Sequence, residues 1–426
     1  MKIENYRKRI ADKKIEHYLK LFGAICIEGP KYCGKTWAGR YHSNSEVLLH
    51  KQTGETSNNV ELAKISPTLI LQGEKPRLID EWQEATNLWD EIRIDVDKSG
   101  LKGQYILTGS STPNRVGIAH SGAGRYGKIY LRTMSLFESG DSSGDVSLEK
   151  LCNNELKEKL TGEVALRYLA SLIIRGGWPG NLGYSPKDSS KIIEEYIKLI
   201  IDDDMIRLDG VNRDKHKVKL LLKSLARNES TTVSNMTLKK DISEVDNEDI
   251  DVDTIASYLN ALDKLYLLDN DEPFSTNIRS SVRVKQLEKR HFADPSLACS
   301  LLNIKEEERL INDLNTFGFL FEALVERDLK IYADSFNAKC YHYQDYNNRE
   351  IDSVIELENG EWCAFEIKLG ANKIEEGAKN LLKIKEEIEI NNGKAPSVLC
   401  VICGLSNAAY KRPDGVYVVP ITALKP

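Results

Sequence analysis

The eight residues Gly-Pro-Lys-Tyr-Cys-Gly-Lys-Thr at positions 29–36 constrain the fold more than any other part of this chain of 426 residues. They fit the pattern G-x-x-x-x-G-K-[ST] in full and follow the apolar run Ala24 to Ile27. Glycines in such a loop let backbone N–H groups wrap phosphate oxygens, and the following helix adds the dipole of its N-terminus. The pattern therefore predicts a strand, a phosphate-binding loop and a helix in direct succession.

The chemistry of phosphate transfer assigns roles within this loop. Lys35 is expected to reach the β- and γ-phosphates of a nucleoside triphosphate, and Thr36 is expected to ligate Mg²⁺. The other residues expected to contact the nucleotide are Gly29, Pro30, Lys31, Tyr32, Cys33, Gly34 and Trp37. The loop thus predicts a nucleotide and Mg²⁺ as cofactors.

Two further elements of nucleotide hydrolysis are expected downstream. The run RLIDE at 77–81 is a short apolar stretch that ends in two acids. Asp80 would hold Mg²⁺ through its water shell, and Glu81 would polarise the attacking water. The strand-like run GQYILTGSS at 103–111 contains Ser110, whose hydroxyl could lie beside the γ-phosphate. The alternative for Ser110 is an ordinary strand end.

Three other residues near these elements have open interpretations. Arg125, in GAGRYGK, could be an arginine finger that completes the site of a neighbouring subunit, which would require a homo-oligomer. It could equally be a structural arginine. Trp82 and Gln83 could contact the nucleotide or simply pack.

The first 140 residues alternate short apolar runs with helical stretches, separated by glycine and proline. Repeated strand–helix units predict an α/β domain in which helices flank a parallel sheet. The runs expected to be strands are GAICIEG at 23–29, TLILQG at 68–73, PRLIDE at 76–81 and GQYILTGSS at 103–111.

Two modules are expected in the middle of the chain. Helical periodicity predicts a helical lid over 141–213, interrupted by the turn GGWPG at 176–180. Over 214–290, helices at 217–228 and after a cap at Asp253, followed by a short strand, suggest a winged helix-turn-helix. Such a module either packs as a structural part or contacts DNA. The acidic run SEVDNEDIDVD weakens the DNA interpretation.

Residues 291–426 are expected to form another α/β domain. A helix at 315–333 precedes three strand-like runs, a helix at 374–390 and further strands. This order of elements is that of the core of restriction-endonuclease-like nucleases.

Four side chains of this last domain are expected to converge: Glu322 in the helix, Asp352 in EIDSVIEL, and Glu366 and Lys368 in AFEIKLG. Residues i and i+2 of a strand face the same side, so Glu366 and Lys368 project together. Asp352 and Glu366 would hold Mg²⁺ for phosphodiester cleavage, and Lys368 would orient the nucleophile. The alternatives are solvated strand ends, or a fold that binds nucleic acid without cutting it.

Composition narrows the class of protein. The formal net charge of −6 argues against avid non-specific nucleic-acid binding but leaves room for a local basic surface. The eight cysteines lack framework spacing, so reduced buried thiols are expected, including the pair Cys400 and Cys403. No apolar run is long enough to span a bilayer, and positions 1–9 lack the apolar core of a signal peptide. A cytoplasmic protein without membrane contact is expected.

The motifs GPKYCGKTW, PRLIDEWQ, GQYILTGSS, GAGRYGKI, IIRGGWPGN, HFADPSL, GFLFEALVERDL and FEIKLG together resemble one family, the prokaryotic AAA-family ATPases with a C-terminal domain of unknown function. The resemblance implies that the nucleotide is ATP. It also implies a winged helix in the middle of the chain and a restriction-endonuclease-like domain at its end, with the site residues named above in the corresponding roles.

Three functions compete. The first is an ATP-hydrolysing, DNA-associated protein whose C-terminal domain is a Mg²⁺-dependent nuclease. The second is a nucleotide-dependent switch or scaffold that binds protein or DNA partners without cleavage, which the acidic net charge favours. The third is a small-molecule kinase, and the size of the chain and its extra domains argue against it.

Overall fold

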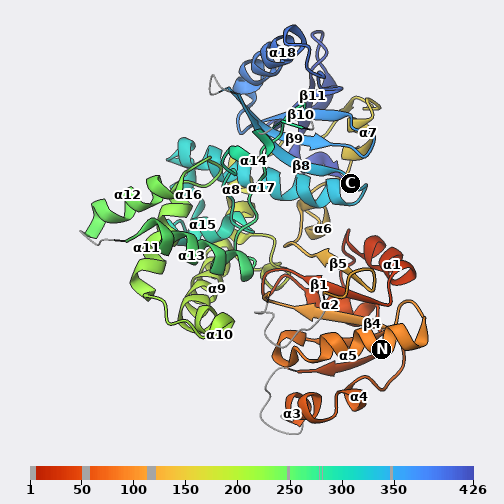
Figure 1. The fold of residues 1–426 in the computed structure, drawn as a ribbon. Coiled ribbons are helices and arrows are strands. Elements are labelled where there is room, and N and C mark those ends of the chain that lie inside the picture. Colours follow the sequence, from red (N-terminus) through yellow and green to blue (C-terminus); the bar gives the residue numbers. More distant parts are fainter. Residues whose placement is uncertain are drawn as a thin grey trace. The chain divides into compact units, whose positions relative to one another are not determined.

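The computed structural model describes residues 6–49, 58–112, 121–246, 250–277, 279–280, 282–345 and 349–426 (Figure 1). The chain divides into two compact units. The first unit is Met1–Thr133, Asp203–Arg213 and Ala261–Leu267; the second is Met134–Asp202, Asp214–Asn260 and Leu268–Pro426. This division does not separate the lid, the winged helix and the restriction-endonuclease-like domain from one another, and their boundaries stay predictions.

The first unit is built on a five-stranded sheet with strand order β2-β3-β4-β1-β5, in which every pairing is parallel. The strands are β1 (Ala24–Glu28), β2 (Ser45–Leu48), β3 (Arg77–Asp80), β4 (Tyr105–Gly109) and β5 (Tyr126–Tyr130). The helices are α1 (Asp12–Leu21), α2 (Lys35–Tyr41), α3 (Asn58–Ile65), α4 (Pro67–Ile70), α5 (Leu88–Ser99) and α10 (Met205–Asp209). Since all five strands run the same way, their carboxyl ends share one edge, which we call the carboxyl edge.

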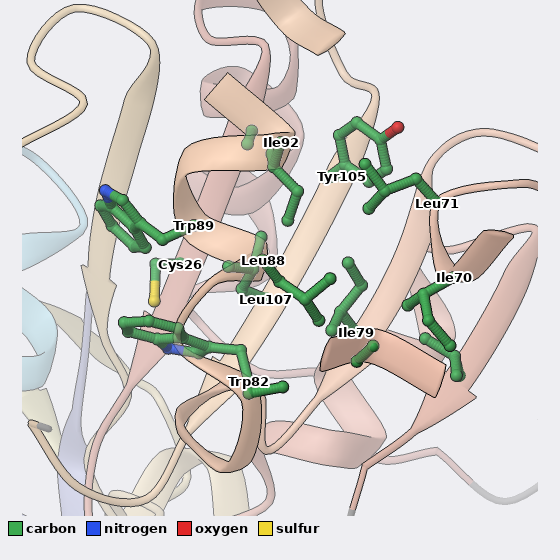
Figure 2. Packing of buried hydrophobic residues seen from close by; sticks show 14 of the residues in the cluster. Cys26, Ile70, Leu71, Ile79, Trp82, Leu88, Trp89, Ile92, Tyr105 and Leu107 are labelled. Atoms are coloured by element: carbon green, nitrogen blue, oxygen red, sulfur yellow. The ribbon is translucent and has the colours of Figure 1, made fainter. Parts of the chain in front are cut away.

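Side chains of the sheet alternate between two buried clusters, as the period of a strand requires. In β1, Ile25 and Ile27 pack with Ile15 of α1 and Ala38 of α2 on one face. On the other face, Cys26 belongs to the cluster drawn in Figure 2, together with residues of α4 and α5. With helices on both faces, the strands are buried, as expected for a parallel sheet.

The expected strand TLILQG is wrong. Its first residues lie in α4, and the remaining strand of the sheet is β2, within a mostly polar stretch. Pro67 occupies the first turn of α4, where proline is favourable because its fixed φ suits a helix start. Ile70 and Leu71 are buried in the core cluster (Figure 2). A short apolar run alone does not distinguish a strand from a buried helical turn. The other three expected strands are confirmed.

The second unit contains a seven-stranded sheet with order β7-β12-β13-β11-β10-β9-β8. Its strands are β7 (Lys159–Leu160), β8 (Lys339–Gln344), β9 (Glu350–Glu356), β10 (Trp362–Lys368), β11 (Val398–Cys403), β12 (Ala408–Lys411) and β13 (Tyr417–Pro420), while β6 (Val146–Ser147) pairs separately with β14 (Leu424–Lys425). β10, β11 and β13 are parallel, and β8, β9 and β12 are antiparallel to their neighbours.

Helices make up the rest of the second unit. They are α6 (Leu136–Ser139), α7 (Leu148–Cys152), α8 (Leu166–Arg175), α9 (Pro186–Leu199), α11 (Lys215–Arg227), α12 (Asn235–Asp246), α13 (Val252–Lys264), α14 (Val282–Lys285), α15 (Pro295–Leu301), α16 (Glu307–Ile311), α17 (Leu314–Asp334) and α18 (Ile374–Ile390); the last turn of α13 belongs to the first unit. The expected C-terminal order is confirmed by α17, β8, β9, β10, α18 and β11. Asp253 lies inside α13 and does not cap it.

Two expectations from composition can be checked directly. All eight cysteines are free, and seven of them are buried, including Cys400 and Cys403 of β11; Cys340 is partly exposed. Within the described ranges, no helix is long and apolar enough to cross a membrane.

Three of the sequence motifs meet at a buried ion pair in the second unit. Arg327 of α17 lies 3.0 Å from Asp294 Oδ2, which also accepts a 2.9 Å hydrogen bond from the backbone N–H of Gly177. The indole of Trp178 donates to Ser296 Oγ at 2.8 Å. Buried polar contacts therefore join the motifs GGWPG and HFADPSL to the helix α17. These contacts account for the polar residues of the two motifs by a role in stabilising the fold.

His291 is held between two buried carboxylates. Its Nδ1 lies 3.1 Å from Glu229 Oε1, and its Nε2 lies 3.1 Å from Asp271 Oδ2. Asp271 also pairs with Lys330 of α17 at 2.8 Å. Burial alone would lower the pKa of His291, but the hydrogen bonds that its ring donates to the Asp271 and Glu229 carboxylates outweigh burial and raise this pKa to about 9.

This raised pKa predicts that stability falls with rising pH. The contribution of His291 is complete below its ordinary pKa of 6.5 and is lost as pH rises to about 9. The shift corresponds to at most about 3 kcal/mol in the free energy of unfolding. Urea titrations between pH 6 and 9.5 should show this loss in the wild type and much less of it in His291→Gln. The exposed His17→Gln is the control, and equal pH dependence in wild type and His291→Gln would contradict the assignment.

Candidate functional site

The expected nucleotide residues gather at the carboxyl edge of the first unit. The phosphate loop follows β1, Asp80 ends β3, and Ser110 follows β4. β4 lies between β1 and β3, and Thr108 of β4 is in register with both Ile27 and Asp80. The topology therefore brings three segments that are distant in sequence to one place.

The backbone of the phosphate loop requires its glycines. Gly29 has φ 151° and Gly34 has φ 104°. A Cβ on Gly29 would lie 2.2 Å from the carbonyl oxygen of Leu131, a contact that no side chain tolerates. Lys35 is buried, and its ammonium donates to the carbonyl oxygen of Pro30 at 2.7 Å. The Lys35 side chain thus folds back over the phosphate loop, and its ammonium group points toward the loop backbone.

Asp80 joins the loop to the sheet. Its Oδ1 accepts hydrogen bonds from Thr36 Oγ1 at 2.8 Å and from Thr108 Oγ1 at 2.5 Å. All three side chains are at the carboxyl edge, and Asp80 and Thr108 are buried. Thr36 and Asp80, the two residues expected to serve Mg²⁺, are therefore in direct contact.

Glu81 has a left-handed backbone, with φ 58° and ψ 50°. This conformation is costly for a residue other than glycine and is often found at functional sites. The side chain accepts a 2.8 Å hydrogen bond from Ser110 Oγ, and the Gln83 amide lies against the same carboxylate oxygen. Gln83 also donates to Ser110 at 3.3 Å. Ser110 and Gln83 thus both contact the Glu81 carboxylate.

Trp82 is buried and packs in the core cluster. The ring centroids of Trp82 and Trp89 are 4.8 Å apart, and both rings lie in the same cluster as Cys26 (Figure 2). The ring of Trp89 also stacks on that of Tyr126, with 3.9 Å between centroids.

The other loop residues differ in their exposure. Tyr32 and Trp37 are about half exposed, and Cys33 is buried, with its thiol donating to Leu131 O at 3.2 Å. Lys31 pairs with Asp204 Oδ1 at 2.5 Å. Asp204 ends a π-helical turn, Ile200–Asp204, and belongs to the first unit. Sequence patterns gave no signal for Asp204, because it is more than 150 residues from its partner.

Arg125 lies away from the phosphate loop of its own chain. It directly precedes β5, whose first residue is in register with Ala24, whereas the loop follows the other end of β1. Its Nε donates to Asp97 Oδ1 at 2.8 Å, and its side chain is about half exposed. The structure does not bring Arg125 together with Lys35 and Glu81, and its action on a neighbouring subunit stays a prediction.

Arg9 is a site residue that the sequence did not reveal. Its guanidinium is buried and donates to Cys33 O in the phosphate loop at 2.9 Å, and to Arg132 O and Thr133 O at 2.9 and 3.2 Å. The Arg9 backbone N–H donates to Asp12. Arg9 therefore fastens the phosphate loop to the segment that follows β5. A single arginine about 20 residues before the loop matches no motif that could have indicated this role.

The four expected residues of the second unit also converge. Lys368 Nζ lies 2.5 Å from Glu366 Oε2 and 3.2 Å from Asp352 Oδ2. Asp352 Oδ2 also accepts a hydrogen bond from the Ile367 backbone at 2.7 Å, and Asn380 of α18 donates to Glu366 Oε1 at 2.7 Å. The prediction that Glu366 and Lys368 project together with Asp352 beside them is correct in its geometry.

Glu322 is linked to this group through a lysine that the sequence did not indicate. Lys289 is buried, contacts Glu322 Oε1, and donates to the backbone oxygen of Asp352 at 3.2 Å. Burial would lower the pKa of Lys289, but Glu322 and Asp352 outweigh burial and raise it. Lys289 precedes the helix α17 by about 25 residues, and no pattern in the sequence pairs the two.

The carboxyl groups have different pKa values. Burial, with Asp352 nearby, raises the pKa of Glu366 to about 8, and burial raises that of Glu322 to about 7. Burial acts the same way on Asp352, but Lys368 and Lys289 outweigh it and lower that pKa. Of the three carboxyl groups, Asp352 is therefore the one that ionises most readily. In the part of the chain that the structure describes, no three His, Cys, Asp or Glu side chains are arranged to hold a metal ion.

The contacts of Arg9 predict a role in nucleotide binding. Arg9→Ala should weaken ATP binding roughly tenfold or more, because the phosphate loop loses a charged donor to Cys33 O and the buried carbonyls lose their partner. Arg9→Lys should restore only part of the affinity, since one ammonium cannot span three carbonyls. Titration with a fluorescent ATP analogue would measure this. The exposed neighbour Lys8→Ala is the control, and unchanged affinity in Arg9→Ala would contradict the role.

Comparisons with known proteins match three successive parts of the chain. Residues 22–139 match a family model described as an AAA domain. Residues 166–308 and 317–424 match two models described as domains of unknown function, DUF8612 and DUF4143. Uncharacterized proteins of Mycobacterium bovis and Mycobacterium tuberculosis are each 25% identical over 366 residues, which is 85% of this chain and 74% of theirs.

Two solved structures show weak overall similarity. The Walker-type ATPase of Pyrococcus abyssi is 14% identical, with a TM-score of 0.44, over 71% of this chain and 97% of that one. The RuvB Holliday junction branch migration motor of Thermotoga maritima is 15% identical, with a TM-score of 0.27, over 61% and 88%. Both TM-scores lie below 0.5, so neither structure defines the fold of the whole chain. The AAA match coincides with the parallel sheet, the phosphate loop and Asp80, and residues 22–139 form an AAA-type P-loop ATPase domain.

Proposed function

We propose that this protein binds ATP with Mg²⁺, hydrolyses it, and couples this ATPase to association with DNA. The observation that carries the hydrolysis is the contact of Thr36 and Thr108 with Asp80, beside a Glu81 held by Ser110. Phosphoryl transfer depends mainly on positioning and charge stabilisation. A rigid, hydrogen-bonded set of side chains at the end of a buried sheet supplies both.

The residues fit a hard cation at this site. Thr36 Oγ1 and Asp80 Oδ1 are 2.8 Å apart, and hydroxyl and carboxylate oxygens are the donors that Mg²⁺ prefers. The ion, when bound with the nucleotide, neutralises charge on the phosphates. Lys35 binds the β- and γ-phosphates, the backbone of the glycine loop wraps them, and Glu81 orients the attacking water. Ser110 and Gln83 fix the direction of the Glu81 carboxylate.

Two variants separate binding from hydrolysis. Lys35→Ala should lose most ATP affinity, at least roughly tenfold, because it removes the cation of the loop. Glu81→Gln should keep ATP affinity and hydrolyse roughly 100-fold more slowly or worse, because an amide cannot polarise water. Phosphate release and nucleotide titration would measure these effects, with the exposed Glu84→Gln as the matched control. If Glu81→Gln hydrolyses ATP at the normal rate, Glu81 is not the residue that polarises the attacking water.

For the second unit, a nuclease is the first candidate. Lys368 lies within hydrogen-bond distance of both Asp352 and Glu366, on the adjacent strands β9 and β10, in a domain with the element order of restriction-endonuclease-like folds. In this arrangement Asp352 carries the negative charge, and Lys368 could orient or activate the attacking water.

The ion-paired arrangement does not itself fit a divalent metal. The Lys368 ammonium occupies the side of Asp352 and Glu366 that a cation would need. A divalent ion would supply Lewis-acid chemistry for phosphodiester cleavage, and accepting it requires Lys368 to leave both carboxylates.

A nucleotide-dependent switch without cleavage is the second candidate. It is favoured by the two lysines, Lys289 and Lys368, which neutralise the carboxylates within the unit. A group of this kind can stabilise the fold and specify one packing without doing chemistry. Homo-oligomers with Arg125 acting in trans are compatible with either candidate, since the exposed Arg125 lies away from its own loop.

One assay distinguishes the two candidates. Purified protein is incubated with single- and double-stranded DNA and Mg²⁺ or Mn²⁺, with and without ATP. A nuclease predicts cleavage that Asp352→Asn reduces at least roughly 100-fold, while ATP hydrolysis is unchanged. The exposed Glu358→Gln is the control. If no DNA is cleaved in any nucleotide state while ATP hydrolysis is intact, the nuclease function is ruled out and the nucleotide-dependent switch is supported.

A further inference from the structure

The solvent face of α11 is uniformly basic. Its exposed residues are Lys215, His216, Lys219, Lys223 and Arg227, and Lys217 is half-buried. The opposite side is apolar and packs into the unit, with Val218, Leu221 and Leu225 fully buried. α11 therefore has an ordinary core side and a solvent side without a single acid.

This face differs from other helices of the same chain. On α9, the exposed residues include Lys187, Lys191, Glu194 and Glu195, so both charge signs are mixed. A mixed face is the usual result of selection for solubility. In a chain with a net charge of −6, a helix that carries four lysines and arginines and no acid on its exposed side is not explained by average composition.

The adjacent helix α13 has the opposite character. Its exposed residues are Asp253, Ala256, Ser257, Asn260 and Asp263. In a helix-turn-helix module the recognition helix lies in the major groove against phosphates on both sides. If α11, α12 and α13 form such a module, α13 is the expected recognition helix, and its acidic face is unfavourable for that position.

The spacing of the basic face suits a phosphate backbone. Lys215, Lys219, Lys223 and Arg227 recur every four residues and form a line about 18 Å long, given a rise of 1.5 Å per residue. One DNA strand carries a phosphate about every 3.4 Å along the helix axis, so the line spans about five phosphates. A linear array of cations matches a linear polyanion better than it matches a compact acidic patch.

We infer that the basic face of α11 is a binding surface for the sugar–phosphate backbone of DNA, and that α11 rather than α13 makes the main contact. This inference rests on the proposed DNA association and names its surface. Contacts of this kind depend on charge and carry no base sequence. The predicted binding is therefore independent of DNA sequence and steeply dependent on salt.

The ion pairs of this face identify the residues to test. Lys215 pairs with Asp202 at 2.8 Å and Arg227 pairs with Asp241 at 2.7 Å, at the two ends of the line. Lys219 and Lys223 lie in the middle and form no such ion pair with any residue that the structure describes. Substituting these two removes charge from the surface without leaving a carboxylate unpaired.

The test is DNA binding by the full chain in EDTA, so that no cleavage occurs. The probe is a fluorescent 30-base-pair duplex, measured by anisotropy from 50 to 200 mM salt. The double variant Lys219→Gln/Lys223→Gln should weaken binding. It should also make the slope of log K against log salt less steep by about 1.8, because two contacts to phosphates are lost. Over this salt range the wild type should therefore lose roughly tenfold more affinity than the variant. Lys187→Gln/Lys191→Gln on α9, with the same spacing, should behave as wild type.

The outcomes separate this inference from the proposal on which it rests. A wild type that does not bind the duplex at 50 mM salt would overturn both. A wild type that binds, with the α11 and α9 variants equal to it, would overturn the α11 surface and leave DNA association intact. Polyglutamate that competes as well as DNA would overturn DNA in favour of an acidic protein partner. Lys219→Arg/Lys223→Arg should retain binding, and its loss would show that the face acts through packing and not through charge.

Discussion

The first unit depends on one shared acceptor, the Oδ1 atom of Asp80. It accepts hydrogen bonds from Thr36 in the phosphate loop and from Thr108 in β4, so one carboxylate fixes the relation between the loop and the two strands beside it. Asp80 can do this because β3, β4 and β1 are parallel, and parallel strands bring their carboxyl ends to the same edge. Burial strengthens these hydrogen bonds, since water competes less for the donors. The phosphate loop is thereby positioned by the sheet rather than by its own glycines alone.

The sequence was most informative about position where a function demands a local pattern. The positions of Lys35, Thr36, Asp80 and Ser110 at the carboxyl edge could be predicted because each ends or follows a strand whose apolar run is visible in the sequence. The apolar run TLILQG was misassigned because its three apolar residues do not determine a period, and the strand β2 was missed because it has only four residues, two of them polar. Arg9 was missed for a different reason. Its partners are backbone carbonyls, which every residue has, so nothing in the partner's sequence could indicate the contact.

The C-terminal group shows the same limit for side chains. The i and i+2 spacing in β10 places Glu366 and Lys368 on one side, and the strand β9 adds Asp352, so three members followed from local periodicity. Lys289 could not follow from any period, because it reaches Glu322 through tertiary packing alone. Its effect is large, since a buried carboxylate without a cation would lose much of its charge. The electrostatics of such a group is therefore decided by residues that a motif does not contain.

The carboxyl edge of the first unit also receives two segments from much later in the chain. Asp204 pairs with Lys31 of the phosphate loop, and Tyr266 donates to or accepts from Thr112 at 2.8 Å, just beyond β4. Thr112 N–H also donates to the carbonyl oxygen of Lys264 at 2.9 Å. The segment Asp203–Arg213 continues into the second unit at Asp202 and Asp214, and the segment Ala261–Leu267 continues into it at Asn260 and Leu268. A change at Lys31 or after β4 therefore acts on residues that are covalently continuous with α9 and α13. Coupling between two sites needs an element whose arrangement both sites bias, and these two segments are the physical candidates for that element.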